Sequence, residues 1–249
     1  MDIAVTAEEF LIAAHSVPES NLVDGLGHGG LVVIAPHPDD ETLGCGGLIA
    51  KACAEGREVR VIILSDGTGS HPASKLYPRD RLRDLRESES RQATEELGLD
   101  PKQILFLGLP DRFVPTHGGR AEHAVTTIVG SARQIAATAL FVTWRHDPHC
   151  DHIAGYRIAR LAQERLLNTR LYEYSIWGEK LPPQTPVTSP DVGFRLCIGE
   201  HLSKKKRAIE AHRSQTTRLI ADDPSGFCLS EEDLARFTRP YEAFSVGLK

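Results

Sequence analysis

Short apolar segments alternate with longer amphipathic ones between residues 31 and 176, and this alternation limits the possible folds more than any other feature. The apolar segments have the length of strands, and the amphipathic ones are long enough for helices. Strands that alternate with helices form parallel sheets, with the crossover helices packed on both faces. The predicted strands cover residues 31–35, 58–64, 104–107, 140–144 and 170–176, and the predicted helices cover residues 43–55, 79–97, 122–137 and 152–167.

The first of these strands, Leu31 to Ala35, is a continuous apolar run between a glycine and a proline. A run of this kind, without polar alternation, is typical of a central strand buried on both faces. We therefore expect an α/β fold: a Rossmann-like, doubly wound, mostly parallel sheet with helices on both faces. We expect one domain over residues 1–249, in which residues 1–29 form an N-terminal extension that covers the core.

The pattern changes after residue 178. Four prolines between residues 182 and 190 predict an irregular loop, which a strand over residues 192–198 and a basic helix are expected to follow. No internal repeat or linker divides the chain.

The charge and cysteine content exclude several classes of protein. The formal net charge is -5 with mixed signs along the chain, which gives no positive field for a nucleic acid backbone. The N-terminus lacks the basic start and cleavage site of a signal peptide, and no apolar run reaches the roughly 18 residues of a membrane span. Five scattered cysteines without a C-x-x-C pair are expected to be free thiols. We therefore expect a cytoplasmic protein that binds no nucleic acid.

A cluster of ionisable residues follows the first strand directly, where residues 35–47 read APHPDDETLGCGG. His37 and Asp40, three apart on a turn that enters a helix, can both face one point, whereas Asp39 must project elsewhere. Imidazole and carboxylate are normal zinc ligands, so one aspartate can bind metal while its neighbour acts as a base. The alternative is that the acidic residues only cap the helix. A dinucleotide-binding loop is also possible at such a junction, but the glycines do not fit G-x-G-x-x-G.

A second cluster follows a later strand, where residues 144–152 read WRHDPHCDH. Loops at the carboxyl ends of parallel strands can meet in one crevice, which would bring this cluster to the first. His152, at the start of the next helix, is expected to be the third zinc ligand beside His37 and Asp40. For any one histidine here, the alternative is an ordinary surface residue of a loop. Cys150 is not expected to be a ligand, because thiolates belong mainly to structural zinc sites.

Taken together, the two clusters resemble the LmbE-like, or PIG-L, family of zinc-dependent N-deacetylases. The family's His-Pro-Asp-Asp-Glu block matches residues 37–41, and its His-x-Asp-His block matches residues 149–152. The resemblance extends over nearly everything after residue 30, as shown by residues 65–67, 86–89, 97–98, 109–111 and 214–215. One departure is Cys150, where the family commonly has proline, and this change could alter the pose of His149.

The resemblance implies a zinc-dependent hydrolase that removes the N-acetyl group from an N-acetylglucosamine-type sugar or glycoconjugate. Zinc would be held by His37, Asp40 and His152, and Asp39 would be the general base. A protonated His149 would stabilise the oxyanion and protonate the departing amine, with Asp151 tuning or orienting it.

The same resemblance places Arg86 and Asp111 near the sugar, where they could contact hydroxyls or, for Arg86, a phosphate. The alternatives are a surface ion pair for Arg86 and a plain turn residue for Asp111. Other functions left open are an inactive carbohydrate-binding protein of the same fold, a hydrolase of another acyl amide, and a metal-dependent phosphatase. A homo-oligomer is possible.

Overall fold

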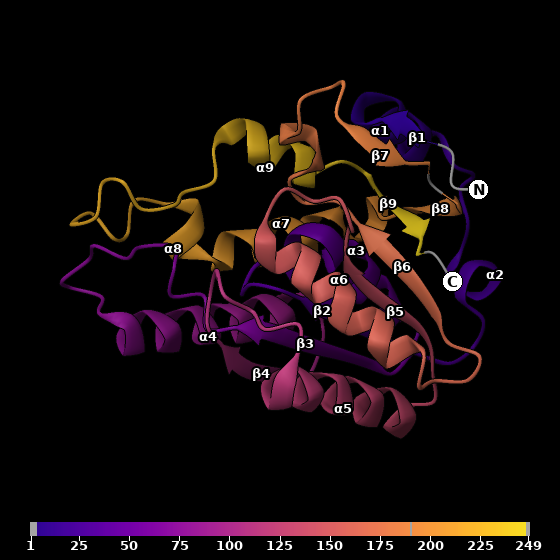
Figure 1. Ribbon diagram of the computed structural model, residues 1–249, viewed down its shortest axis with the longest axis horizontal. Coiled ribbons are helices and arrows are strands. Elements are labelled where there is room, and N and C mark those ends of the chain that lie inside the picture. Colours follow the sequence, from indigo (N-terminus) through magenta and orange to yellow (C-terminus); the bar gives the residue numbers. More distant parts are fainter. Residues whose placement is uncertain (1–3, 190, 248–249) are drawn as a thin grey trace.

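The computed structural model describes residues 4–189 and 191–247. Its main sheet has seven strands in the order β4-β3-β2-β5-β6-β9-β8 (Figure 1). Neighbouring strands from β4 to β6 run parallel, whereas β9 is antiparallel to both β6 and β8. The mostly parallel α/β fold predicted from the sequence is therefore confirmed. The strands of this sheet are β2 (Gly30–Ala35), β3 (Val59–Ser65), β4 (Ile104–Leu109), β5 (Ala137–Thr143), β6 (Arg170–Tyr174), β8 (Asp191–Cys197) and β9 (Tyr241–Val246).

Helices cover both faces of this sheet (Figure 1). On one side α3, α4 and α7 pack against one another, and on the other side α5 packs against α6. The helices are α1 (Ala7–Ser16), α2 (Leu22–Leu26), α3 (Asp40–Ala54), α4 (Arg79–Glu96), α5 (Gly118–Gln134), α6 (Cys150–Gln163), α7 (Leu202–Ala211), α8 (Arg213–Thr216) and α9 (Glu231–Phe237).

Strand β2 shows how the sequence produces two hydrophobic layers. All six of its residues are buried, as the continuous apolar run predicts. Since successive side chains of a strand point to opposite faces, Leu31 and Val33 join the core on the α3 side, while Val32 and Ile34 join the core on the α5 and α6 side. The strand is thereby fixed in register, because a shift by one residue would exchange its two faces.

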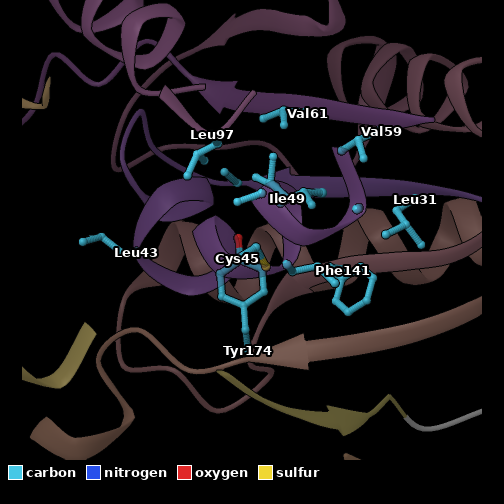
Figure 2. Close-up of a cluster of buried hydrophobic side chains, with 14 of the residues drawn as sticks. Leu31, Leu43, Cys45, Ile49, Val59, Val61, Leu97, Phe141 and Tyr174 are labelled. Carbon is cyan, nitrogen blue, oxygen red and sulfur yellow. The ribbon is translucent and has the colours of Figure 1, made fainter. Parts of the chain in front are cut away.

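Helix α3 lies unusually close to the sheet because its first turns contain glycines. A Cβ atom on Gly44 would overlap the ring of Tyr174, and one on Gly47 would come within 2.5–2.7 Å of Ile198. Figure 2 shows Tyr174 beside this part of α3, near Cys45. The Tyr174 hydroxyl donates a hydrogen bond of 2.8 Å to the Ile34 carbonyl, so the ring cannot move away freely. This packing fixes the helix that begins at Asp40.

A buried carboxylate on β9 also holds α3. Glu242 accepts hydrogen bonds from the backbone N–H groups of Gly47 and Leu48, at 2.6 and 2.8 Å. The same carboxylate pairs with the ammonium of Lys205 from α7, at 2.7 Å. Both ionic side chains are almost fully buried, so each supplies the partner that the other needs away from water.

The sequence-based description was incomplete at both ends of the chain. Residues 186–188, expected in an irregular loop, form strand β7 (Pro186–Thr188), which pairs with β1 (Ala4–Thr6). Helix α1 lies within the predicted N-terminal extension, and its Phe10 packs on Trp144 with ring centroids 4.4 Å apart. Strand β9 was not predicted.

Three helices also begin earlier than the apolar pattern indicated. The starts of α3, α5 and α6 lie at Asp40, Gly118 and Cys150, because polar and small residues fill their first turns. Correspondingly α5 and α6 end earlier, at Gln134 and Gln163, and β5 starts earlier, at Ala137. Within the described residues no helix combines the length and the apolar character needed to cross a bilayer.

Candidate active site

The two ionisable clusters meet at the carboxyl ends of adjacent strands. The first follows β2 and leads into α3, and the second follows β5 and leads into α6. Since β2 and β5 are hydrogen-bonded neighbours in the parallel sheet, both clusters open into the same crevice. Figure 1 shows two long loops, residues 68–78 and 217–230, projecting side by side at this end of the sheet.

Three side-chain atoms at this crevice form a small, nearly equilateral triangle. The Nδ1 atom of His37 lies 3.1 Å from Oδ2 of Asp40 and 3.2 Å from Nε2 of His152. The third edge, from His152 Nε2 to Asp40 Oδ2, measures 3.2 Å. The structure therefore brings together the three side chains that the sequence suggested as metal ligands.

The size and chemistry of this triangle suit a zinc ion. Ligand atoms bound at about 2.0–2.1 Å around a tetrahedral zinc are about 3.3 Å apart, close to the observed edges. Two imidazole nitrogens and one carboxylate oxygen are a normal donor set for zinc, and three protein ligands leave a fourth position open. His37, Asp40 and His152 therefore fit a catalytic zinc ion.

Carboxylates contact both imidazoles at the ring nitrogen that faces away from the triangle. The free ring nitrogen of His37, Nε2, lies 3.2 Å from Asp151 and 3.4 Å from Asp111, and that of His152, Nδ1, lies 3.0 Å from Asp147. Burial opposes protonation of His152, but Asp40 and Asp147 outweigh it and raise its pKa to about 9. Such partners fix which ring nitrogen faces a metal.

The side chain of Asp151 differs from the sequence-based expectation. Its carboxylate contacts the His37 ring and accepts hydrogen bonds from the backbone N–H groups of Arg112 and Val114, at 2.6 and 3.0 Å. It was expected to orient His149, but only its backbone N–H reaches that ring. The β4–α5 turn thus aims Asp151 at His37.

Asp39 is a buried carboxylate with a strained backbone. Its φ angle of 156° and ψ of −29° lie outside the regions that residues other than glycine prefer. It stands at the N-cap of α3, yet its side chain makes no capping hydrogen bond, contrary to the capping interpretation. Burial raises the pKa of Asp39 to about 6, although the Arg86 guanidinium counteracts this rise. A carboxylate with such a pKa is suited to general base catalysis near neutrality.

Arg86 is buried against the motif rather than paired on the surface. Its guanidinium donates to the carbonyls of Gly67 and Pro38, both at 2.8 Å, and lies 3.3 Å from Oδ2 of Asp39. The expected alternative, a surface ion pair with a neighbouring glutamate, is therefore wrong. Only its Nε atom lacks a partner among the described residues.

Asp111 is also more than a turn residue. Its carboxylate accepts the Gly69 N–H at 2.7 Å and contacts the His37 ring. Burial opposes its ionisation, but the His37 contact prevails and lowers the pKa of Asp111 below its usual value.

His149 is held in one tautomer by its position at the N-cap of α6. Its Nδ1 atom accepts a hydrogen bond from the backbone N–H of Asp151 at 3.2 Å, so a neutral ring carries its proton on Nε2. Burial and the neighbouring rings of His37 and His152 lower the pKa of His149 to about 4. With Nδ1 accepting, the Nε2–H group of His149 is available as a donor, and the protonated state expected from the sequence stays a prediction.

A cavity of about 110 Å³ adjoins these groups. Trp177 and Phe227 form an aromatic part of its wall, with ring centroids 5.8 Å apart in an edge-to-face arrangement. The cavity is lined by His37, Asp39, Asp40, Gly69, Ser70, Arg86, Asp111, Arg112, His149, Trp177, Gln215 and Phe227. It therefore combines two of the catalytic candidates, Asp39 and His149, with both substrate-binding candidates and residues from distant loops.

Two residues near the site carried no role in the sequence-based description. Asp147 is fully buried: its Oδ1 lies 3.0 Å from His152 Nδ1, and its Oδ2 accepts hydrogen bonds from the backbone N–H groups of Ile176 and Trp177. The only feature of the sequence that could have marked Asp147 as functional is its position in the second cluster. Gln215, also fully buried, lines the cavity from α8, and only its place in the resemblance marked it.

Comparison with known proteins places this geometry in a family. Residues 32–163, which include both clusters, match the family described as "PIG-L: GlcNAc-PI de-N-acetylase". The chain belongs to the PIG-L family. The family predicted from the two clusters is therefore confirmed, and with it the class of activity, metal-dependent N-deacetylation by an enzyme.

One curated PIG-L relative is similar over most of its length. It is the 1D-myo-inositol 2-acetamido-2-deoxy-alpha-D-glucopyranoside deacetylase of Saccharomonospora viridis, 28% identical over 232 residues that cover 75% of this chain and 85% of the relative. That name describes removal of an acetyl group from an amino sugar joined to inositol.

Two solved structures share the fold of this PIG-L chain. The N,N'-diacetylchitobiose deacetylase of Pyrococcus horikoshii superposes with a TM-score of 0.65 at 18% identity, covering 96% of this chain and 90% of that one. The 4-carboxy-2-hydroxymuconate hydratase of Pseudomonas putida does so with a TM-score of 0.69 at 18% identity, covering 89% and 97%. Because one is a hydratase, the fold alone does not define the reaction, which must be argued from the site.

Proposed function

We propose that this chain is a zinc-dependent hydrolase that removes the N-acetyl group from an N-acetylglucosamine-type amino sugar or glycoconjugate. The products are acetate and a free amine. The observation that carries the proposal is the triangle of His37, Asp40 and His152 with the carboxylate of Asp39 beside it. The S. viridis relative and the chitobiose deacetylase, both named for N-acetylated sugars, support the substrate class.

Zinc bound by His37, Asp40 and His152 would act as a Lewis acid that polarises the amide carbonyl and lowers the pKa of water. Asp39 accepts a proton at its carboxylate as water attacks the carbonyl carbon. Its pKa of about 6 keeps it ionised at neutral pH, yet basic enough to hold that proton. The protonated Asp39 is then placed to return the proton to the departing amine, so no separate cationic acid is needed.

His149 serves as a hydrogen-bond donor in this scheme. Its Nδ1 is occupied by the Asp151 N–H, which leaves Nε2–H for the oxygen on which negative charge develops. A neutral donor suits a site that already contains a dication, since a second cation nearby would be repelled. Asp151, Asp111 and Asp147 position the two ligand imidazoles.

The proposal is tested by a screen for amine release. The protein, freed of metal and reloaded with zinc, is incubated with N-acetylglucosamine, its disaccharide and N-acetylglucosaminyl glycosides, and amine and acetate are quantified. Equimolar amine and acetate, dependent on zinc and lost in His37→Ala, are expected. A chain that binds zinc but releases no amine from any of these sugars would contradict the substrate class.

The same screen separates the alternatives. Sugar binding without turnover would identify an inactive carbohydrate-binding protein, amine release only from other acyl amides would identify a different amidase, and phosphate release would identify a phosphatase. Four further expectations remain predictions: a single domain over residues 1–249, a cytoplasmic location, a homo-oligomer and no binding to nucleic acid.

A further inference from the structure

Gln215 has a buried amide oxygen that no group among the described residues satisfies. The residue is 0% exposed and lines the cavity of the candidate active site, yet its Oε1 atom has no hydrogen-bond partner in the part of the chain that the structure describes. Its backbone is fully used, because its N–H donates to His212 and its carbonyl accepts from Leu229. A buried polar atom without a partner is costly, and in an enzyme it requires an explanation.

A chain of hydrogen bonds fixes which end of the Gln215 amide faces the cavity. Both oxygens of Glu89 accept from Ser214: one from its backbone N–H at 2.8 Å and the other from its hydroxyl at 2.6 Å. Since a carboxylate can only accept, the single proton of the Ser214 hydroxyl is used on Glu89. The hydroxyl oxygen can then only accept, and it receives Nε2–H of Gln215 at 2.8 Å.

The reverse orientation of the amide is therefore disfavoured. It would set Gln215 Oε1 against the oxygen of Ser214, which has no proton left to share. Glu89 and Ser214 thus hold the amide so that its oxygen is left for a ligand. A hydrogen-bond donor on the substrate would satisfy it.

An unmatched donor lines the same cavity. Arg86 lies one turn before Glu89 on α4, on the same face of the helix. Its other guanidinium nitrogens are engaged, but Nε–H has no partner within residues 4–189 and 191–247. The residues that line the cavity therefore include one unused acceptor and one unused donor, both buried. A hydroxyl group both donates and accepts, so it matches this pair.

We propose that Gln215 is a specificity-determining residue that accepts a hydrogen bond from a ring hydroxyl of the amino sugar, with Arg86 Nε–H as the complementary donor. This inference rests on the proposed function. It predicts that catalysis requires one particular hydroxyl of the substrate, and that the ability of this hydroxyl to donate a hydrogen bond matters more than its ability to accept one.

The test compares sugars that lack one hydroxyl with sugars that carry fluorine there. N-acetylglucosamine glycosides with hydrogen or fluorine at position 3, 4 or 6 are assayed for kcat/KM with wild type and with Gln215→Met. Fluorine cannot donate, so at one position both analogues are expected to react about 10- to 100-fold more slowly than the parent with wild type. With Gln215→Met, replacing the hydroxyl at that position by fluorine should no longer lower kcat/KM; we call this decrease in the wild type the fluoro penalty. Gln134→Met, exposed at the end of α5, is the matched control and keeps the wild-type pattern.

A second variant tests the direction of the hydrogen bonds from Gln215 through Ser214 to Glu89. Ser214→Ala removes the acceptor that fixes the amide, so Gln215 can turn its NH2 group toward the sugar and the fluoro penalty should shrink. Equal penalties for each analogue in wild type, Gln215→Met and Ser214→Ala would overturn the proposal, even if the variants were slower with every sugar.

Binding keeps this test separate from the test of the proposed function. If wild type releases no amine, ligand-observed NMR with the same sugars measures their binding to wild type and to Gln215→Met. Weaker binding to the variant, restricted to sugars with the required hydroxyl, supports the contact. Equal binding, or none to either protein, overturns it.

Discussion

The carboxylate of Asp147 is expected to control metal affinity, although it touches no metal position. Its Oδ1 lies 3.0 Å from His152 Nδ1 and accepts a hydrogen bond from the His149 N–H at 3.3 Å. Its Oδ2 receives the N–H groups of Ile176 and Trp177, at 3.2 and 2.8 Å. Asp147→Asn keeps the shape of the side chain but replaces one of these acceptors with a donor.

The asparagine amide has two possible orientations, and their costs can be compared. With NH2 toward Ile176 and Trp177, two buried backbone donors lose their acceptor, at about 1–3 kcal/mol each. With NH2 toward His152, only the long 3.3 Å bond from the His149 N–H is lost, and His152 Nδ1 must accept, so the ring proton moves to Nε2, the atom that would bind metal. Loss of such a supporting contact lowers metal affinity about 10- to 100-fold, or about 1.4–2.8 kcal/mol. The second orientation costs less overall.

We therefore expect Asp147→Asn to bind zinc about 10- to 100-fold more weakly while its free energy of unfolding without metal falls by less than about 2 kcal/mol. Competition with a chromogenic chelator measures the first quantity, and urea denaturation measures the second. Asp222→Asn is the matched control, because Asp222 also accepts backbone N–H groups, of Lys75 and Leu76, away from the ligands. Unchanged zinc affinity in a folded Asp147→Asn protein would refute the reasoning.

Three further outcomes are expected. Asp39→Asn should keep zinc but lower kcat/KM about 10²- to 10⁴-fold, and a parallel loss of zinc in a metal titration would instead make Asp39 a ligand. The kcat/KM of the wild type should fall below pH about 6, as Asp39 takes up a proton. The Arg86 guanidinium lowers the pKa of Asp39, so Arg86→Met should raise that pKa and move the acidic limb of the kcat/KM profile to higher pH. An acidic limb at the wild-type pH would contradict the pairing of Arg86 with Asp39. Gly44→Ala should reduce the free energy of unfolding in urea by about 1–3 kcal/mol through overlap with Tyr174, whereas Gly130→Ala on α5, where a Cβ meets nothing within 4 Å, should not destabilise.

The sequence predicted the parallel half of the fold well, for a physical reason. Strands buried on both faces must be apolar throughout, so β2 and β5 are visible as continuous runs. Strand β9 has no such run, because its Glu242 is turned inward to α3 and Lys205. A buried charge is readable only when its partners are known, and here they lie elsewhere in the sequence.

The candidate site divides in the same way. The candidate ligands and Asp39 lie in two short motifs at the ends of strands, so their proximity could be predicted from the parallel sheet. The direction of each side chain did not: Asp151 faces His37, and Arg86 is buried against the first motif. Both depend on the conformation of turns between elements. The orientation of Gln215 depends on a hydrogen-bond chain across α4 and α8, which no local pattern records.

The placement of β9 between β6 and β8 has a consequence for the order of folding. Strand β8 comes earlier in the chain, yet in the sheet it is separated from β6 by β9, so it has no partner there until β9 has inserted. Until then β6 presents an open edge of unpaired backbone groups, which can pair with another copy of the chain and lead to aggregation. Damage to β9 should therefore release β8 with it as one cooperative unit, visible as a shared loss of protection in hydrogen exchange.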